Sequence, residues 1–245
     1  MSVLILGGSS LIAKCTADNF AAHSHNVIFA GRHTDELDKL AKDFQIRYKN
    51  KTYTLYFDAI DYNSHEKFLQ EALKLLPDLD NVLIAFGYLG EQEKANNDFN
   101  EARKSLEANF VGAVSITNHI SDYFEKEKKG TIIIISSVAG DRGRQSNYIY
   151  GSAKAGLTAY ASGLRNRLFK SGVHVLTVKP GFVDTPMTYG MKTPKLLTAS
   201  PKTVGRLIYK AALKKKNVVY TPFYWKYIMK IVKSIPESIF KKLKT

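Results

Sequence analysis

The segment VLILGGSSLIAK, residues 3–14, decides the fold class of this 245-residue chain. Four apolar residues predict a short buried strand, two glycines follow, and the next residues have the apolar spacing of a helix. A strand that passes through glycines into a helix is typical of a nucleotide-binding α/β fold, in which the helix N-terminus meets a phosphate. We expect Gly7 and Gly8 to form the tight turn, and Ser9 and Ser10 to cap the helix and donate hydroxyl groups to the phosphate.

Two positions of this loop depart from the usual glycine pattern of dinucleotide-binding loops. Leu11 and Ala13 stand where glycines are expected. Ala13 is the mildest replacement for a glycine that permits close packing, whereas the side chain of Leu11 has to turn away from the pyrophosphate. We expect Leu11 and Ile12 to lie beside the cofactor. Taken alone, the loop also fits an ordinary strand-to-helix turn without a ligand.

The rest of the chain alternates between short β-rich runs and segments with helical spacing. Further strands are predicted at residues 26–30, 52–58, 81–86, 131–136, 174–178 and 217–221, and helices at 12–23, 35–44, 64–76 and 105–126. Short strands that are apolar on both faces and separated by helices predict a parallel sheet covered on both sides. We expect one Rossmann-like, doubly wound α/β domain with about seven strands over residues 1–222, followed by a basic amphipathic segment, residues 223–245.

The charge of the chain is concentrated at its C-terminal end. The formal net charge is +14, and residues 202–245 contain twelve Lys or Arg against one acid, Glu237. Such an excess predicts an anionic partner, either a membrane surface or a nucleic acid. The single cysteine, Cys15, allows no intramolecular disulfide, and no secretory signal or membrane-spanning apolar run is recognisable, so we expect a cytoplasmic protein.

The candidate catalytic residues lie close together in the segment SSVAGDRGRQSNYIYGSAKAG, residues 136–156. Tyr150 and Lys154 are four apart and share one face of a helix that begins near Tyr148. An ammonium beside a phenol lowers a pKa that is otherwise about 10, so Tyr150 can exchange a proton near neutral pH. Ser137 ends the preceding strand at the carboxyl edge of the sheet, where its hydroxyl can polarise a substrate carbonyl.

A set of motifs in fixed order resembles the short-chain dehydrogenase/reductase family over nearly the whole chain: Gly7-Gly8, Asn109, Ser137, Tyr150, Lys154 and Pro180-Gly181. The resemblance implies that Tyr150 is the general acid, and that Lys154 lowers its pKa and holds the nicotinamide ribose. Ser137 would orient the carbonyl, and Asn109 would help to keep a water for proton relay. As a set, these residues predict an NAD(P)-dependent oxidoreductase without a metal.

The same resemblance extends to the cofactor. It implies that Thr185 contacts the nicotinamide carboxamide, and the other expected cofactor contacts are Phe86, Gly87, Pro180, Gly181 and Val183. The family usually has Asn-Asn-Ala-Gly where this chain has IAFGYLG, residues 84–90. Arg32 follows the second strand, where an acid would hold the 2′-hydroxyl of NAD, so NADP(H) is favoured over NAD(H). Asp58 is placed to accept from the adenine amine.

Three stretches resemble one branch of the family, the decaprenylphosphoryl-2-keto-ribose reductases: residues 84–90, 139–156 and 220–245. This likeness implies a polyprenyl-phosphoryl 2-keto-pentofuranose substrate in cell-envelope polysaccharide synthesis, and a flavin-dependent oxidase as a partner that supplies it. The wider family suggests a homodimer or a homotetramer. Arg142 and Arg144 are expected to contact the substrate phosphate, because a guanidinium pairs two phosphate oxygens; solvated loop charges are the alternative.

The C-terminal segment has two faces. Between residues 223 and 233, one helical stripe contains Trp225, Ile228, Met229 and Val232, and another contains Lys226, Lys230 and Lys233. A basic amphipathic segment of this kind suits the interface of an anionic bilayer. We therefore expect the protein at the inner face of the membrane, with the packing of the apolar stripe onto the domain as the alternative.

Two other functions fit parts of the pattern. The same chemistry can reduce a soluble nucleotide-linked keto-sugar or an acyl ketone. A non-catalytic nucleotide-sensing or nucleic-acid-binding protein would use the basic tail instead. The tail aromatics share a stripe with aliphatic residues and form no separate stacking platform, so we expect no nucleic acid partner.

Overall fold

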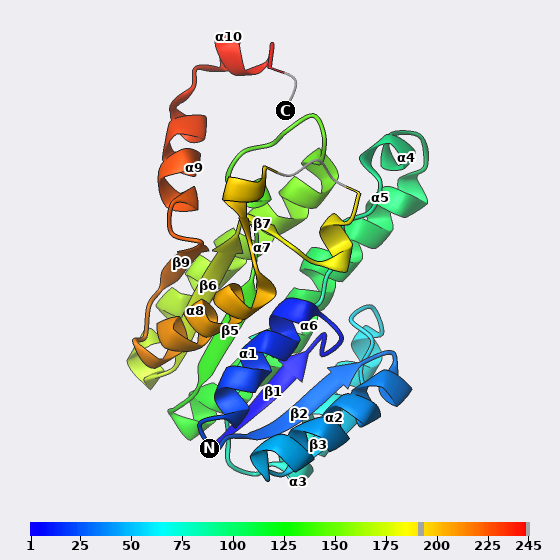
Figure 1. The fold of residues 1–245 in the computed structure, drawn as a ribbon, viewed down its shortest axis with the longest axis vertical. Coiled ribbons are helices and arrows are strands. Elements are labelled where there is room, and N and C mark those ends of the chain that lie inside the picture. The colour runs from blue at the N-terminus through cyan, green and yellow to red at the C-terminus, as the bar shows by residue number, and fades with distance from the viewer. Residues whose placement is uncertain (191–193, 244–245) are drawn as a thin grey trace.

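The computed structural model describes residues 1–190 and 194–243. Its centre is a seven-stranded sheet with strand order β3-β2-β1-β4-β5-β6-β9, in which each neighbouring pair is parallel (Figure 1). The strands are β1 (Ser2–Leu6), β2 (Asn26–Gly31), β3 (Thr52–Tyr56), β4 (Leu79–Ile84), β5 (Thr131–Ile135), β6 (His174–Pro180) and β9 (Val218–Thr221). The predicted doubly wound fold is confirmed, and all seven predicted strands are present.

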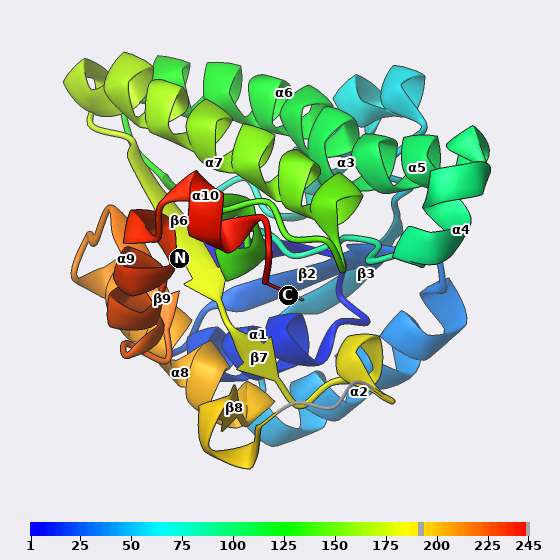
Figure 2. The ribbon, with the colours of Figure 1, turned by 90° about the horizontal axis from the view of Figure 1, so that it is seen from above.

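Helices cover both faces of the sheet (Figure 2). One face carries α3 (His65–Leu75), α6 (Gly112–Glu127) and α7 (Tyr148–Leu168), and the other carries α1 (Leu11–Ala21), α2 (Thr34–Tyr48) and α8 (Pro201–Leu213). Each layer has its own apolar core. Phe124 and Leu157 belong to the first core, and Phe20, Phe44 and Ile208 to the second.

The predicted helix at residues 105–126 is part of a longer arrangement. It begins earlier, in α5 (Phe99–Leu106), passes through a π-helical turn (Glu107–Val111), and continues as α6. A π-helical turn shifts the register of the side chains that follow it, and such turns are frequent at functional sites. Sequence periodicity also missed α4 (Gln92–Asn97) and the paired two-residue strands β7 (Phe182–Val183) and β8 (Thr198–Ala199).

The C-terminal segment, described to residue 243, forms α9 (Trp225–Ser234) and α10 (Glu237–Phe240) beyond the edge strand β9 (Figures 1 and 2). Its apolar stripe packs on the domain, because Trp225 and Met229 are buried against Val138. The indole of Trp225 occupies the space beside Gly181, where an added Cβ would lie 1.9 Å from Nε1. The expectation that this stripe meets a membrane is therefore wrong. In the described ranges, no helix is long and apolar enough to cross a bilayer.

Candidate active site

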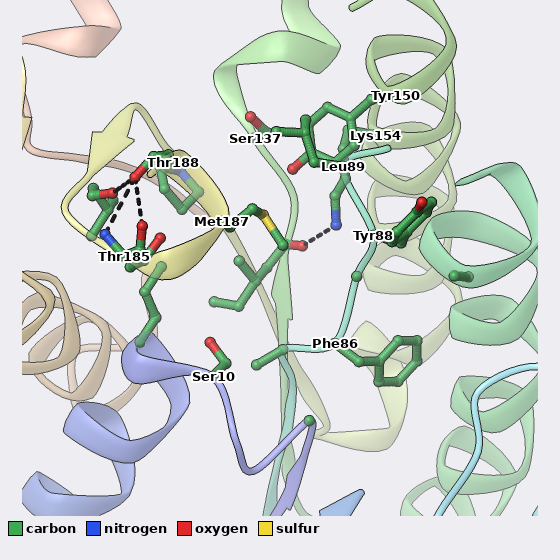
Figure 3. A pocket seen from close by; sticks show the side chains of 18 of the residues that line it. Ser10, Phe86, Tyr88, Leu89, Ser137, Tyr150, Lys154, Thr185, Met187 and Thr188 are labelled. Carbon is green, nitrogen blue, oxygen red and sulfur yellow. Dashed lines mark hydrogen bonds between the residues drawn. The ribbon is translucent and has the colours of Figure 1, made fainter. Parts of the chain in front are cut away.

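A cleft of about 460 Å³ opens at the carboxyl edge of the sheet, between the loops that follow β1 to β6 (Figure 3). A ligand site at this edge is the general arrangement of doubly wound sheets. Most of the residues predicted from the sequence line it: Gly7, Ser9, Ser10, Leu11, Ile12, Arg32, Asp58, Phe86, Gly87, Ser137, Arg144, Tyr150, Lys154, Pro180, Gly181, Val183 and Thr185. Gly8, Asn109 and Arg142 do not line it.

The glycine loop after β1 is fixed by its backbone. Gly7 has φ +86°, and an added Cβ would lie 2.6 Å from the amide nitrogen of Phe86, so this position requires glycine. The N–H groups of Gly7 and Gly8 both donate to the carbonyl of Ala30 at 2.9 and 3.0 Å. Ser10 precedes α1, but its side chain makes no capping hydrogen bond, contrary to expectation. The Ser10 hydroxyl at the cleft is consequently available to a phosphate group.

The catalytic side chains come from β5 and α7. Ser137 follows β5, and its Oγ accepts from the N–H of Ala139 at 3.1 Å. Tyr150 lies in the first turn of α7 and Lys154 one turn later, as the spacing predicts, and Figure 3 shows Ser137 beside Tyr150. Lys154 is 3% exposed, and its Nζ donates to the carbonyl of Ile135 at 3.1 Å. This bond anchors the ammonium between helix and strand, 5.6 Å from the centre of the Tyr150 ring.

Burial sets the protonation of this pair. It raises the pKa of Tyr150 to about 12, against the lowering effect of a hydrogen bond with Ser137. Burial also lowers the pKa of Lys154 to about 8. The expectation that Lys154 lowers the pKa of Tyr150 is therefore wrong for the protein alone, in which burial raises that pKa. A phenol that keeps its proton at neutral pH is in the form that a general acid needs for ketone reduction.

Asn109 lies behind the cleft, in the π-helical turn, and is 1% exposed. Its Nδ2 donates to the carbonyls of Tyr88 and Ser105, and its Oδ1 accepts from the N–H of Tyr88. An added Cβ on Gly87 would lie 2.6 Å from that Oδ1. Asn109 therefore fixes the loop after β4 against the helix, and its part in a proton relay stays a prediction.

The residues expected at the two ends of the cofactor also line the cleft. Arg32 is exposed in the loop after β2, and Asp58 accepts at Oδ1 from the N–H of Ile60 at 3.1 Å. At the nicotinamide end, the hydroxyl of Thr188 donates to the carbonyl of Val183 at 2.7 Å and accepts from the N–H of Thr185 at 3.3 Å, which fixes their loop (Figure 3). Hydroxyls at a helix N-terminus, a cation after β2 and a fixed loop after β6 fit a phosphorylated dinucleotide.

The two arginines between Ser137 and Tyr150 have different surroundings. Arg142 points away from the cleft: it donates to the carbonyls of Val232 and Ile235 at 2.7 and 2.6 Å and pairs with Glu237 at 2.9 Å. Because its guanidinium already holds the C-terminal segment, we do not keep Arg142 as a substrate residue. Arg144 lines the cleft and donates to the sulfur of Met229 at 3.2 Å.

The family model described as short chain dehydrogenase matches residues 1–195. The chain belongs to the short-chain dehydrogenase/reductase family. An uncharacterised oxidoreductase of Mycobacterium tuberculosis is 32% identical over 98% of this chain and 96% of its own length, and one of Streptomyces coelicolor is 32% identical over 99% and 95%. Like other members of this family, the protein is an NAD(P)-dependent oxidoreductase.

A solved short-chain dehydrogenase of Sphingobium yanoikuyae, in complex with NADPH, has the same fold. Its TM-score is 0.83 at 18% identity, over 99% of this chain and 96% of that one. The likeness confirms the predicted Rossmann-like fold.

Several cleft residues of this short-chain dehydrogenase/reductase were missed by sequence reasoning. Tyr88 and Leu89 follow β4, Lys104 comes from α5, Asn147 precedes α7, and Met187 follows Thr185. Lys104 lies over the ring of Tyr88, with Nζ 4.4 Å from its centre. Tyr88, Leu89 and Met187 are near motifs that were recognised, so proximity could have suggested them. The sequence contained no signal that places Lys104 at the cleft, because the π-helical turn changes the helix register between Lys104 and Asn109.

Proposed function

We propose that the protein is an NADPH-dependent ketoreductase that reduces the carbonyl of a polyprenyl-phosphoryl 2-keto-pentofuranose at a membrane surface. Ser10 and Arg32 would hold the nicotinamide dinucleotide at the cleft, and when bound it would supply the hydride for the carbonyl carbon. Tyr150 gives its proton to the carbonyl oxygen, Ser137 donates a hydrogen bond to that oxygen, and Lys154 holds positive charge beside the phenol as it ionises. The product is the secondary alcohol.

The observation that carries the substrate class is the position of Arg144. This partly buried guanidinium lines the same cleft as Tyr150, and it has no carboxylate partner within 4 Å among the residues that the structure describes. Burial lowers its pKa, which means that the charged form lacks part of its solvation. The nearby carboxylate of Asp141 is paired with Lys179, so a substrate phosphate would give Arg144 a direct counter-charge through two hydrogen bonds.

Preference for NADPH is supported by the loop after β2. Arg32 borders the cleft there, together with His33, and the loop contains no acid that could bind a 2′-hydroxyl. A guanidinium at this position pairs with a 2′-phosphate. The NADPH bound to the solved relative of Sphingobium yanoikuyae agrees with this choice.

Membrane association is supported by the outer face of α9, which consists of Lys226, Tyr227, Lys230, Ile231 and Lys233. All five are exposed, Tyr227 by 59% and Ile231 by 66%. This face is opposite the buried stripe that was expected to bind lipid. Lysines with aromatic and aliphatic neighbours suit an anionic interface, where the ammonium groups contact headgroups.

Exposed side chains near the start of α9 and beside the cleft also support membrane association. Tyr224, at the start of α9, donates from its hydroxyl to the carbonyl of Leu196, and the Leu196 side chain is 92% exposed. Tyr189, which follows the cleft-lining Thr188, is 93% exposed. These apolar side chains would continue the outer face of α9 to the cleft, so that a lipid-anchored substrate reaches Tyr150 from the inner face of the membrane.

The proposal implies further partners. A 2-keto sugar arises by oxidation of a secondary alcohol, so a flavin-dependent oxidase would supply the substrate. We also keep a homodimer or homotetramer as the proposed assembly, because α7 presents small residues such as Gly163, beside which an added Cβ would meet nothing within 4 Å.

Arg144→Ala tests the proposed substrate class. With a phosphorylated keto-sugar, we expect KM to rise about tenfold or more while kcat changes little, because one charged hydrogen-bonding partner of the substrate is lost. With the same sugar lacking phosphate, the variant should match the wild type. Arg103→Ala, which changes an exposed arginine outside the cleft, is the control. An unchanged KM for the phosphorylated substrate would contradict the assignment.

A further inference from the structure

A second cavity, of about 220 Å³, adjoins the reacting centre. It shares Leu89, Asn147 and Tyr150 with the main cleft, so a substrate whose carbonyl lies at Tyr150 can extend into it. Polar side chains from two segments also line it, among them Gln92 of α4 and Glu101 of α5. The cavity is large enough for part of a small ligand, and nothing in the reaction described above uses it.

The start of α7 is capped in an unusual way. An asparagine just before a helix normally accepts a hydrogen bond from an N–H of the first turn. The side chain of Asn147 makes no such bond. The N–H of Ile149 donates instead to Oε1 of Gln92 at 3.0 Å. Gln92 thus performs the capping and leaves the carboxamide of Asn147 unused at the junction of the two cavities.

The carboxamide oxygen of Asn147 has no hydrogen-bond partner among the described residues and is shielded from solvent. A buried acceptor without a donor is unfavourable, and native structures rarely keep one without a reason. The terminal torsion of asparagine is soft, so a modest rotation can turn this oxygen toward a ligand donor. Asn147 borders both cavities, which places that donor close to the carbonyl held by Tyr150.

The lining of the second cavity contains carboxylates. Glu101 is 7% exposed, and its carboxylate accepts from the hydroxyl of Tyr88 at 2.6 Å, a bond that lowers the pKa of Glu101. Glu91 lines the cavity as well, whereas Arg144 lines only the main cleft. Two carboxylates repel a phosphate and accept from neutral O–H groups. The anionic end of a substrate therefore belongs at Arg144, and its hydroxyl groups belong in the second cavity.

We propose that the second cavity is a hydroxyl-binding subsite, in which Asn147 accepts a hydrogen bond from the hydroxyl on the carbon next to the reacting carbonyl. The ligand class is an α-hydroxyketone, of which a 2-keto sugar is one example. This inference rests on the ketone reduction proposed above but not on the lipid carrier, so soluble ketones can test it separately.

The test compares 3-hydroxy-2-butanone with 2-butanone, which lacks the hydroxyl. For each protein, the ratio of the two kcat/KM values is measured with NADPH. Dissociation constants of 2,3-butanediol and 2-butanol are measured in the presence of NADP⁺, so that slow turnover does not hide the effect. Comparing ratios between variants removes the intrinsic difference in reactivity of the two ketones.

Asn147→Ala should lower the preference for the hydroxylated compound about threefold to tenfold, the contribution of one hydrogen bond. Asn147→Asp retains an oxygen acceptor and should keep the preference. Tyr148→Phe is the matched control, because Tyr148 lines neither cavity and bonds only outward to Asn96. Equal ratios in the wild type and Asn147→Ala, for turnover and for binding, would overturn the proposal. If the lipid substrate is not turned over but the soluble ketones are, only the proposed lipid-linked function is overturned.

Discussion

The guanidinium carbon of Arg142 lies over the ring of Phe240, 3.6 Å from its centre, and joins the active-site loop to the end of the C-terminal segment. The same guanidinium donates to the carbonyls of Val232 and Ile235. The loop that contains Ser137 is therefore held by residues about ninety positions later in the chain. The C-terminal segment is part of the support of the active site.

Arg142→Ala should lower the free energy of unfolding by about 2 kcal/mol, because backbone carbonyls lose a charged donor. The C-terminal segment should also become sensitive to limited proteolysis before the rest of the chain. Urea unfolding and the order of cleavage products measure both effects. Arg47→Ala removes exposed ion pairs with Asp18 and Asp43 and should cost less than about 1 kcal/mol. Equal losses in the two variants would contradict the anchoring role of Arg142.

The pKa values of the catalytic pair predict the pH dependence. Ketone reduction needs Tyr150 protonated and Lys154 charged. The Tyr150 pKa of about 12 keeps the acid protonated through the working range, while the Lys154 pKa is lowered to about 8. The kcat/KM for reduction should therefore be level below about pH 8 and fall above it. Alcohol oxidation needs the phenolate and should rise with pH. A reduction rate that stays level to about pH 10 would show that Lys154 does not lose its proton in this way.

Arg32→Asp should reverse the choice of cofactor. The variant loses the cation for the 2′-phosphate and gains an acceptor for the 2′-hydroxyl, so KM for NADPH should rise about tenfold or more while KM for NADH falls. Lys51→Ala, an exposed cation outside the cleft, serves as the control. Unchanged KM values for both cofactors in Arg32→Asp would refute the role of Arg32.

The outer face of α9 predicts binding to anionic vesicles. Replacing Tyr227 and Ile231 together by Ser should weaken sedimentation with phosphatidylglycerol vesicles at least about fivefold, since two apolar side chains no longer enter the interface. Phosphatidylcholine vesicles should bind the wild type weakly. Ile46→Ser, at a residue of α2 that is 78% exposed, controls for the loss of apolar surface in general. The face plays no such role if the double variant binds as the wild type does.

The sequence predicted the parts of the site that follow from periodicity. Apolar runs located the ends of β1 and β5, and helical spacing placed Tyr150 and Lys154 on one face of α7. Arg142 and Arg144 lie two apart in an irregular loop, where no periodicity indicates direction, so their different partners could not be predicted. The stripe of α9 was ambiguous for another reason. An apolar helical face looks the same in sequence whether it packs on protein or on lipid, and Gly181, which makes room for Trp225, lies far from α9 in the chain.

The most direct test follows NADPH oxidation by absorbance, with purified protein and a polyprenyl-phosphoryl 2-keto-pentose in detergent. A soluble keto-sugar is the comparison substrate and Tyr150→Phe the matched variant, which keeps the ring and loses only the proton donor. We expect turnover of the lipid substrate by the wild type and a rate about 10² to 10⁴ lower in Tyr150→Phe, with NADPH binding unchanged. Turnover of the soluble sugar alone, or equal rates in the two proteins, would contradict the proposed function.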